Sequence, residues 1–251
     1  TQGLFYQWGR KDPFTRHKQT SGNLYTTNNN RVSIVESVQN PTVFEGRGKT
    51  GWEETANSSL WMNSQKTIYD PCPSGYKVSS REIWLGFTND SENHYGDVED
   101  YLRASGTFDK GWKFLIDESG DNTAYYPATD LVYYNGDYRT RDSESYLWSN
   151  SYQSDRRANI LRFYYNVDNS ADSWIYIHAD ENTSYGFPVR CMKDDHAVTI
   201  VVSVSGITGI TTSSASVNGY VSVDGSRTVS RRGFVCSISS DPVIESGMVV
   251  E

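Results

Sequence analysis

The stretch Lys66-Thr67-Ile68-Tyr69-Asp70-Pro71-Cys72-Pro73-Ser74-Gly75-Tyr76-Lys77-Val78 places a cysteine inside a rigid turn. Pro71 and Pro73 restrict the backbone on either side of Cys72, and Gly75 tolerates the angles that a tight turn requires. A second cysteine ends the apolar run Gly186-Phe187-Pro188-Val189-Arg190-Cys191, which is typical of a short strand. A bond between Cys72 and Cys191 would close a loop of 119 positions (191 minus 72). Such a loop contributes on the order of 4–5 kcal/mol in the chain-entropy model. Two reduced cysteines are equally compatible with these residues alone.

The third cysteine, Cys236, alternates with Phe234 and Ile238 on one face of an expected strand. We predict that it is a free thiol, buried as a small hydrophobic group. The chain has no Cys-x-x-Cys pair, so zinc and thioredoxin-type sites find no support. A single disulfide would favour an exported protein.

The composition disfavours several classes of protein. The 251 residues carry 23 Lys and Arg against 31 Asp and Glu, a net charge of -8. Nucleic acid is therefore not expected as a partner, because duplex binding depends on basic side chains. No run of about 18 apolar residues occurs, so we expect no membrane span. Hydrophobic residues amount to only 36 %, but 18 Tyr and 7 Trp supply the ring area that a core needs.

A change of composition near Asp194-Asp195-His196 divides the chain. We predict a domain over residues 1–194, a linker over 195–198 and a second domain over 199–251. In the second domain, apolar residues alternate with Ser and Thr from Val198 to Ser205 and again from Ala215 to Val223, as in half-buried strands. An immunoglobulin-like sandwich needs ~100 residues. We therefore expect a partial all-β sandwich that lacks strands or completes its core with another chain.

The first domain is expected to be α+β, with few helices and an irregular antiparallel sheet. Ser79-Ser80-Arg81-Glu82 has the pattern of a capping box, which predicts a helix carrying Ile83, Trp84 and Phe87 on one face. A weaker helix is predicted over 96–104, with acidic residues toward its N-terminus. Strands are predicted over 112–116, 125–127, 146–149, 160–165, 174–178 and 186–192.

No catalytic set emerges from the motifs. Gly46-Arg47-Gly48-Lys49-Thr50 contains Gly-Lys-Thr, but Val43 stands where a phosphate-binding loop needs glycine. The histidines are scattered, and the paired acids and Asp-rich loops lack the spacing of an EF-hand. We therefore expect no enzymatic activity, no cofactor and no metal.

The ordered motifs Gly3–Phe14, Ser37–Pro41, Lys66–Val78, Tyr126–Ala128, Tyr146–Ser149 and Gly186–Cys191 resemble the Fibrobacter succinogenes major paralogous domain of Bacteroidetes fimbrillin-type surface proteins. The resemblance covers roughly residues 1–194. It implies a C-type-lectin-like fold, a disulfide between Cys72 and Cys191, and a place on the cell surface, attached to the outer membrane or to a pilus. Residues 199–251 resemble the first half of immunoglobulin- or fibronectin-like repeats. The Glu-Pro-Asn, Gln-Pro-Asp and Trp-Asn-Asp motifs of calcium-dependent lectins are not present.

The leading functional hypothesis is an extracellular adhesin or pilus-tip module that binds a glycan or a host or bacterial surface protein. Tyr- and Asn-rich loops suit recognition, as in antibody paratopes, although the same residues also solvate loops. The candidate ligand-binding residues are Tyr133, Tyr134, Asn135, Tyr138, Arg139, Arg141, Tyr152, Arg156, Trp174 and Tyr176. The alternative is a structural pilus or surface-assembly subunit without a ligand, which assembles by strand addition at the open edge of 199–251. A carbohydrate-degrading enzyme is a third hypothesis, with no motif behind it.

Overall fold

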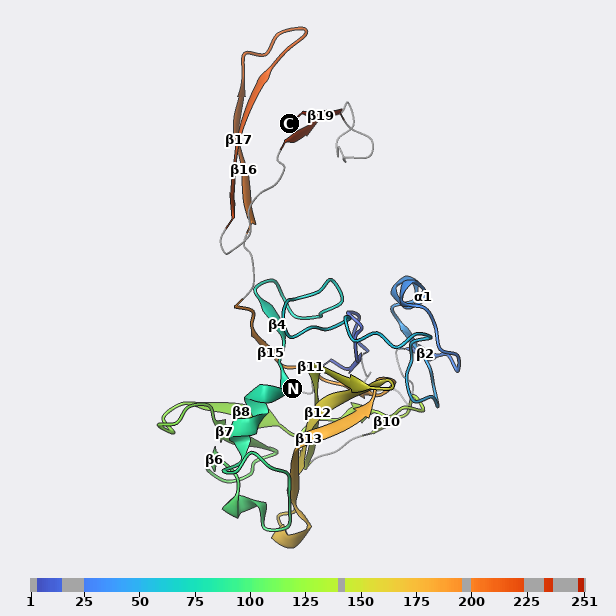
Figure 1. Cartoon of the computed structure of the whole chain (residues 1–251), viewed down its shortest axis with the longest axis vertical. Helices are drawn as coiled ribbons and strands as arrows, with labels where there is room; N and C mark the ends of the chain where they lie inside the picture. Colours follow the sequence, from blue (N-terminus) through green and yellow to red (C-terminus); the bar gives the residue numbers. More distant parts are fainter. Residues whose placement is uncertain are drawn as a thin grey trace. The chain divides into compact units, whose positions relative to one another are not determined.

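The computed structural model describes residues 4–14, 25–139, 143–195, 200–223, 233–236 and 248–250. The chain divides into two compact units, Thr1–Asp194 and Asp195–Glu251, and the division falls where the composition changes. It is mostly β-sheet with a few short helices (Figure 1).

The strands of the first unit form several small sheets. They are β1 (Tyr6–Gln7), β2 (Thr26–Thr27), β3 (Val43–Phe44), β4 (Tyr76–Val78), β5 (His94–Tyr95), β6 (Ala104–Ser105), β7 (Gly111–Leu115), β8 (Thr123–Pro127), β9 (Leu131–Val132), β10 (Tyr138–Arg139), β11 (Glu144–Ser154), β12 (Arg157–Tyr164), β13 (Trp174–Asn182), β14 (Gly186–Phe187) and β15 (Cys191–Lys193). The sheet orders are β1-β14-β9-β10, β11-β12-β13-β5, β6-β7-β8, β15-β4 and β2-β3. All of these pairs are antiparallel except β2 with β3.

The longest strands of the unit, β11, β12 and β13, lie side by side (Figure 1). The sheet that they form separates two hydrophobic clusters. Side chains alternate along a strand. Leu161 and Phe163 therefore enter one hydrophobic cluster, while Ile160 enters the other. The predicted strands over 146–149, 160–165 and 174–178 all lie mainly in this sheet, and the structure extends each of them.

Tryptophans build much of the core on the Ile160 side. Trp8, Trp52 and Trp148 are fully buried, and each indole N–H donates to a backbone carbonyl at 2.8 Å. The acceptors are the carbonyls of Ser149, Trp8 and Tyr6, respectively. Buried indoles need such partners, since an unpaired N–H costs free energy. Ring burial of this kind explains how a chain with few aliphatic residues forms a core.

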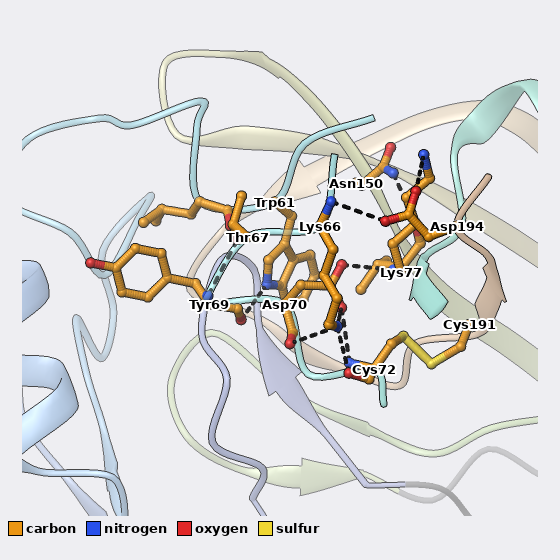
Figure 2. A network of polar contacts seen from close by, with 12 residues as sticks. Trp61, Lys66, Thr67, Tyr69, Asp70, Cys72, Lys77, Asn150, Cys191 and Asp194 are labelled. Atoms are coloured by element: carbon orange, nitrogen blue, oxygen red, sulfur yellow. Dashed lines mark hydrogen bonds and ion pairs between the residues drawn. A yellow bond between two sulfur atoms is a disulfide. The ribbon is translucent and has the colours of Figure 1, made fainter. Parts of the chain in front are cut away.

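The predicted disulfide between Cys72 and Cys191 is confirmed, with a sulfur–sulfur distance of 2.01 Å (Figure 2). It joins the turn before β4 to the first residue of β15, which pairs with β4. The Asp70 carboxylate fixes that turn: it accepts from the backbone N–H of Cys72 at 2.9 Å and of Val78 at 2.8 Å. Lys66 Nζ lies 2.8 Å from Asp70 Oδ1 and neutralises it.

A second ion pair ties the end of the first unit to the same turn (Figure 2). Lys77 Nζ lies 3.3 Å from Asp194 Oδ1, and both side chains are buried. Asp194 Oδ2 also accepts from the backbone N–H of Lys66 at 3.3 Å. We call Lys66, Asp70, Lys77, Asp194 and the disulfide the disulfide clasp.

The predicted capping box at Ser79 is wrong. Residues Arg81–Phe87 form a 3-10 helix, η1, whose N-cap is Ser80, without a side-chain capping bond. Ser79 is extended instead: its N–H donates to Arg190 and its carbonyl accepts from Asn150, each at 2.9 Å. This pairing fixes the backbone before the helix begins, so the Ser79 hydroxyl is buried rather than placed over the first turn.

The helix predicted over 96–104 is also wrong, since only Val98–Asp100 (η2) is helical there. Asp97 has a left-handed φ of 45°, and Leu102 forms a bridge with Thr88. A third 3-10 helix is η3 (Ser170–Asp172). An α-helix that the sequence analysis did not predict, α1 (Ile34–Gln39), begins at Ser33, whose hydroxyl accepts from the Glu36 N–H at 3.2 Å.

The described part of the second unit contains two antiparallel pairs of strands. Strand β16 (Ile200–Thr208) pairs with β17 (Ser216–Val223), and β18 (Phe234–Cys236) pairs with β19 (Met248–Val250). The turn predicted at Asp224-Gly225 and the linker residues 196–198 lie outside the described residues, as does the side chain of Cys236.

Candidate ligand-binding surface

Five side chains gather on one face of the β11-β12-β13 sheet: Tyr146, Arg162, Tyr164, Trp174 and Tyr176. Arg162 is paired directly with Tyr146 on one side and with Tyr176 on the other, and Tyr164 is paired with Trp174. Residues that face each other across neighbouring strands project from the same face of a sheet. All five side chains are half-buried, and we call this set the Arg162 face.

The guanidinium of Arg162 lies over aromatic rings. Its Cζ is 4.7 Å from the centre of the Tyr176 ring and 5.4 Å from that of Trp174, within the range of cation–π attraction. The rings of Trp174 and Tyr164 are 5.8 Å apart, and those of Trp174 and Tyr176 are 5.4 Å apart. The Arg162 guanidinium therefore packs against two of these rings.

Arg162 donates no side-chain hydrogen bond to any residue that the structure describes, and its Nε is buried. Glu181 lies on the neighbouring strand β13, where burial raises the pKa of its carboxyl and the charges of Arg157 and Arg162 oppose that rise. Arg157, by contrast, is bonded to Asp180. Arg162 thus retains donors for an acceptor from outside the described chain.

A second group surrounds the β9–β10 hairpin. The rings of Tyr133, Tyr134 and Tyr185 contact one another with centres 4.7 to 5.6 Å apart, and Arg139 Cζ lies 4.1 Å over Tyr133. Burial and a hydrogen bond with Tyr133 raise the pKa of Tyr185. We call these four residues the Tyr133 cluster.

The two groups are joined through buried rings. Tyr185 contacts Phe187 at 5.3 Å, Phe187 stacks on Tyr146 at 5.3 Å, and Tyr146 meets Trp174 at 6.5 Å. Phe187 is fully buried, so this path runs through the core. The predicted residues Tyr133, Tyr134, Arg139, Trp174 and Tyr176 therefore belong to one connected aromatic system.

Other predicted site residues are engaged inside the protein. The Tyr138 hydroxyl bonds to the buried Asp130, and Tyr152 packs on Trp8 with ring centres 5.2 Å apart. Arg156 donates to the backbone carbonyls of Glu53 at 3.1 Å and Glu54 at 2.7 Å.

Asn135 has a local role, since its side chain bonds to Asp137 within the hairpin turn. Arg141 lies outside the described residues. The block 133–157 consists largely of strands β10 and β11 and not of the loops that we expected.

Five members of the aromatic system were not among the predicted residues: Tyr146, Arg162, Tyr164, Tyr185 and Phe187. A usable signal is the alternation Arg162-Phe163-Tyr164 in β12, which places Arg162 and Tyr164 on one face. Their partners on β13 depend on a register shift between Ile160 and Arg162, which the sequence does not reveal.

The arrangement offers planar rings, a guanidinium and several phenolic hydroxyls, which together suit binding by stacking and hydrogen bonding. Within the described ranges, no group of three or more His, Cys, Asp or Glu side chains is placed to hold a metal ion. No described helix is both long and apolar enough to cross a bilayer.

Comparison with known proteins adds no neighbour: no family model, curated protein or solved structure matches the chain.

Proposed function

We propose that the protein is an extracellular binding module of the cell surface or a pilus tip, and that the Arg162 face recognises an acidic glycan. The first unit is proposed to have a C-type-lectin-like fold, and the second a partial immunoglobulin-like sandwich, on the residues that resemble those families. The proposal assigns binding and not catalysis to the protein.

The observation that carries the proposal is the orientation of Arg162 between Trp174 and Tyr176 without a described acceptor. A guanidinium packed against rings loses little freedom on binding and presents N–H donors to a carboxylate or sulfate. The adjoining rings can stack on the apolar face of a sugar. An acidic sugar satisfies both features, whereas a neutral sugar offers no charge to the Arg162 guanidinium.

The test is binding of the full chain to an array of acidic and neutral glycans, each with calcium and with chelator. We expect sulfated or uronic-acid glycans to bind, without dependence on calcium. Arg162→Ala and Trp174→Ala should each weaken binding about tenfold or more, equivalent to about 1.4 kcal/mol. Arg81→Ala is the matched control, because it removes a partly exposed guanidinium that lies in η1 and not in the Arg162 face.

Two results would count against this assignment. If no glycan on the array binds, a protein ligand would be favoured instead. Binding of an acidic peptide that depends on Arg162 would then identify such a ligand. Equal binding by Arg162→Ala and the unaltered chain would show that the Arg162 face is not the site.

A second candidate function, a surface-assembly subunit, rests on the β16–β17 hairpin. Val202 and Val204 share a face with Val217 and Val221 of β17, yet Val202 is 68 % and Val204 60 % exposed. Among the described residues β16 and β17 pair only with each other, and a two-stranded hairpin is marginally stable in water, so a strand added at either edge would stabilise the pair and extend this apolar face. We propose that this strand would come from a neighbouring subunit.

The assembly function predicts self-association of the full chain that Val202→Ser together with Val204→Ser abolishes. Light scattering coupled to size-exclusion chromatography measures the mass in each case. Ser203→Ala lies on the opposite face of β16 and serves as the control. A monomer at all concentrations would remove this candidate and leave the binding function untouched.

A further inference from the structure

A cleft of about 350 Å³ lies on the first unit, away from the residues of the Arg162 face. It is lined by Phe108, Trp112 and Tyr165, by the aliphatic Leu102 and Val167, and by the acidic Glu99. Its walls come from residues 99–112, which run from η2 through the β6–β7 loop into β7, and from Tyr165 and Val167, which follow β12. These two segments are distant in sequence, and a hollow with three rings in it calls for an explanation beyond core packing.

The three rings contact one another in pairs. Ring centres are 5.4 Å apart for Phe108 and Trp112, 5.1 Å for Phe108 and Tyr165, and 5.1 Å for Trp112 and Tyr165. Two of these contacts are edge-to-face, so the rings do not form a parallel stack. A small group resting above this triangle touches all three rings at once.

The charge at the rim is negative. Glu99 is exposed and forms no ion pair with any residue in the described ranges, and Asp97 and Asp100 flank it. A hydrogen bond with Glu99 and burial together raise the pKa of the Tyr165 hydroxyl, so this hydroxyl stays protonated and available as a donor to the carboxylate. No described residue that lines the cleft is basic.

We propose that this cleft binds an organic cation, a methylated or primary ammonium group, with Phe108, Trp112 and Tyr165 as the ring contacts and Glu99 as the counter-charge. Ring faces attract an ammonium group, and the attraction grows as that group is desolvated. Leu102 and Val167 provide apolar contact for methyl or methylene groups.

The probe is choline, compared with 3,3-dimethyl-1-butanol, which has the same shape and no charge. Binding to the full chain is followed by calorimetry and by tryptophan fluorescence. We expect choline to bind about tenfold more tightly than the neutral alcohol, equivalent to about 1.4 kcal/mol of charge-dependent attraction. Glu99→Gln should remove most of that difference, whereas Asp100→Asn, an exposed neighbour outside the cleft, should retain it.

Tyr165→Phe keeps the ring and removes the hydroxyl, so choline should still bind, while Tyr165→Ala should reduce binding about tenfold. Equal affinity for choline and the alcohol would overturn the proposal. So would unchanged binding by Glu99→Gln, or no saturable binding of choline up to about 10 mM. Because none of these residues belongs to the Arg162 face, failure here and failure of glycan binding are separate results.

Discussion

Tyr164 and Tyr165 are adjacent in the chain, yet their rings lie in different clusters. The Tyr164 ring is 5.8 Å from Trp174 on the Arg162 face, and the Tyr165 ring is 5.1 Å from Trp112 in the cleft. Tyr164 is the last residue of β12 and Tyr165 follows it, so two consecutive residues contribute to the two proposed sites. Successive side chains of an extended chain point to opposite sides, which makes this division possible.

Substitution of these two tyrosines should separate the sites. Tyr164→Ala is expected to weaken acidic-glycan binding about threefold to tenfold, because the Tyr164 ring packs against Trp174, over which Arg162 lies. It should leave choline binding unchanged. Tyr165→Ala should weaken choline binding and leave glycan binding unchanged. Titration of both variants with both ligands measures this, and a variant that loses both activities would indicate that the strand end has been disrupted.

Loss of the disulfide should lower stability more than any single surface change. Cys72 and Cys191 are 119 residues apart, so the bond restricts a long loop in the unfolded chain. The double variant Cys72→Ser/Cys191→Ser is expected to lose about 4–5 kcal/mol of unfolding free energy. Urea denaturation monitored by fluorescence measures the loss, with Cys236→Ser as the control for thiol removal. A change under about 1 kcal/mol would mean that the unfolded chain is compact without the bond.

Asp70 is expected to be the most sensitive carboxylate in the disulfide clasp. It is 1 % exposed and accepts from two backbone N–H groups and from Lys66. Asp70→Asn turns an amide N–H₂ toward one of these donors, so we expect a loss of about 2–3 kcal/mol in urea denaturation. Asp121→Asn, at an exposed position, should change stability by less than about 0.5 kcal/mol.

The contribution of Glu53 to the free energy of unfolding should fall as the pH rises from acidic to neutral values. Burial raises the pKa of this carboxyl above its ordinary value of 4.5, while Thr183 and two arginines oppose the rise. Below that pH, the folded and unfolded states both hold the proton. Above it, the unfolded chain releases the proton first, so unfolding free energy falls by up to ~1.4 kcal/mol per pH unit until the folded pKa is passed.

Glu53→Gln cannot ionise, so its stability relative to the unaltered chain should grow as the pH rises above 4.5. Burial also raises the pKa values of Glu45 and Glu181, so part of the pH dependence should persist in the variant. Urea denaturation at a series of pH values measures the difference. Glu54→Gln is exposed and is the matched control. If the free energy of unfolding differed between Glu53→Gln and the unaltered chain by the same amount at every pH, the pKa of Glu53 would be the same in the folded and unfolded states.

The sequence predicts the β-rich character of the chain better than its helices. Strands marked by alternation, such as Trp174–Asn182, were found near their predicted positions. The capping bond expected at Ser79 did not form, because long-range pairing with Arg190 and Asn150 overrides the local pattern, and a 3-10 helix begins instead at Arg81. The same pattern at Ser33 and Glu36 begins an α-helix, and there the capping bond forms. Tertiary contacts therefore decide whether this local pattern forms its capping bond.

The candidate site was only partly predictable. The aromatic composition was enough to predict Trp174 and Tyr176 as site residues. Arg162 could not be predicted in the same way, because its place in the site depends on the strand register that sets it opposite Tyr176. That register includes a bulge, and a one-residue slip would move each side chain to the other face. The cleft at Phe108 depends on two separated segments, 99–112 and 165–167, whose meeting no periodicity encodes.

The disulfide clasp determines how the chain responds to tension. A pull applied at the two ends passes from residue 72 directly to residue 191 through the sulfur–sulfur bond, because a covalent bond outlasts the hydrogen bonds around it. The residues between these cysteines carry no load along the backbone. Arg162, Trp174, Phe108, Trp112 and Tyr165 all lie in that protected interval. Both proposed sites therefore lie in the segment that bears no backbone tension while the residues outside the bond are stretched.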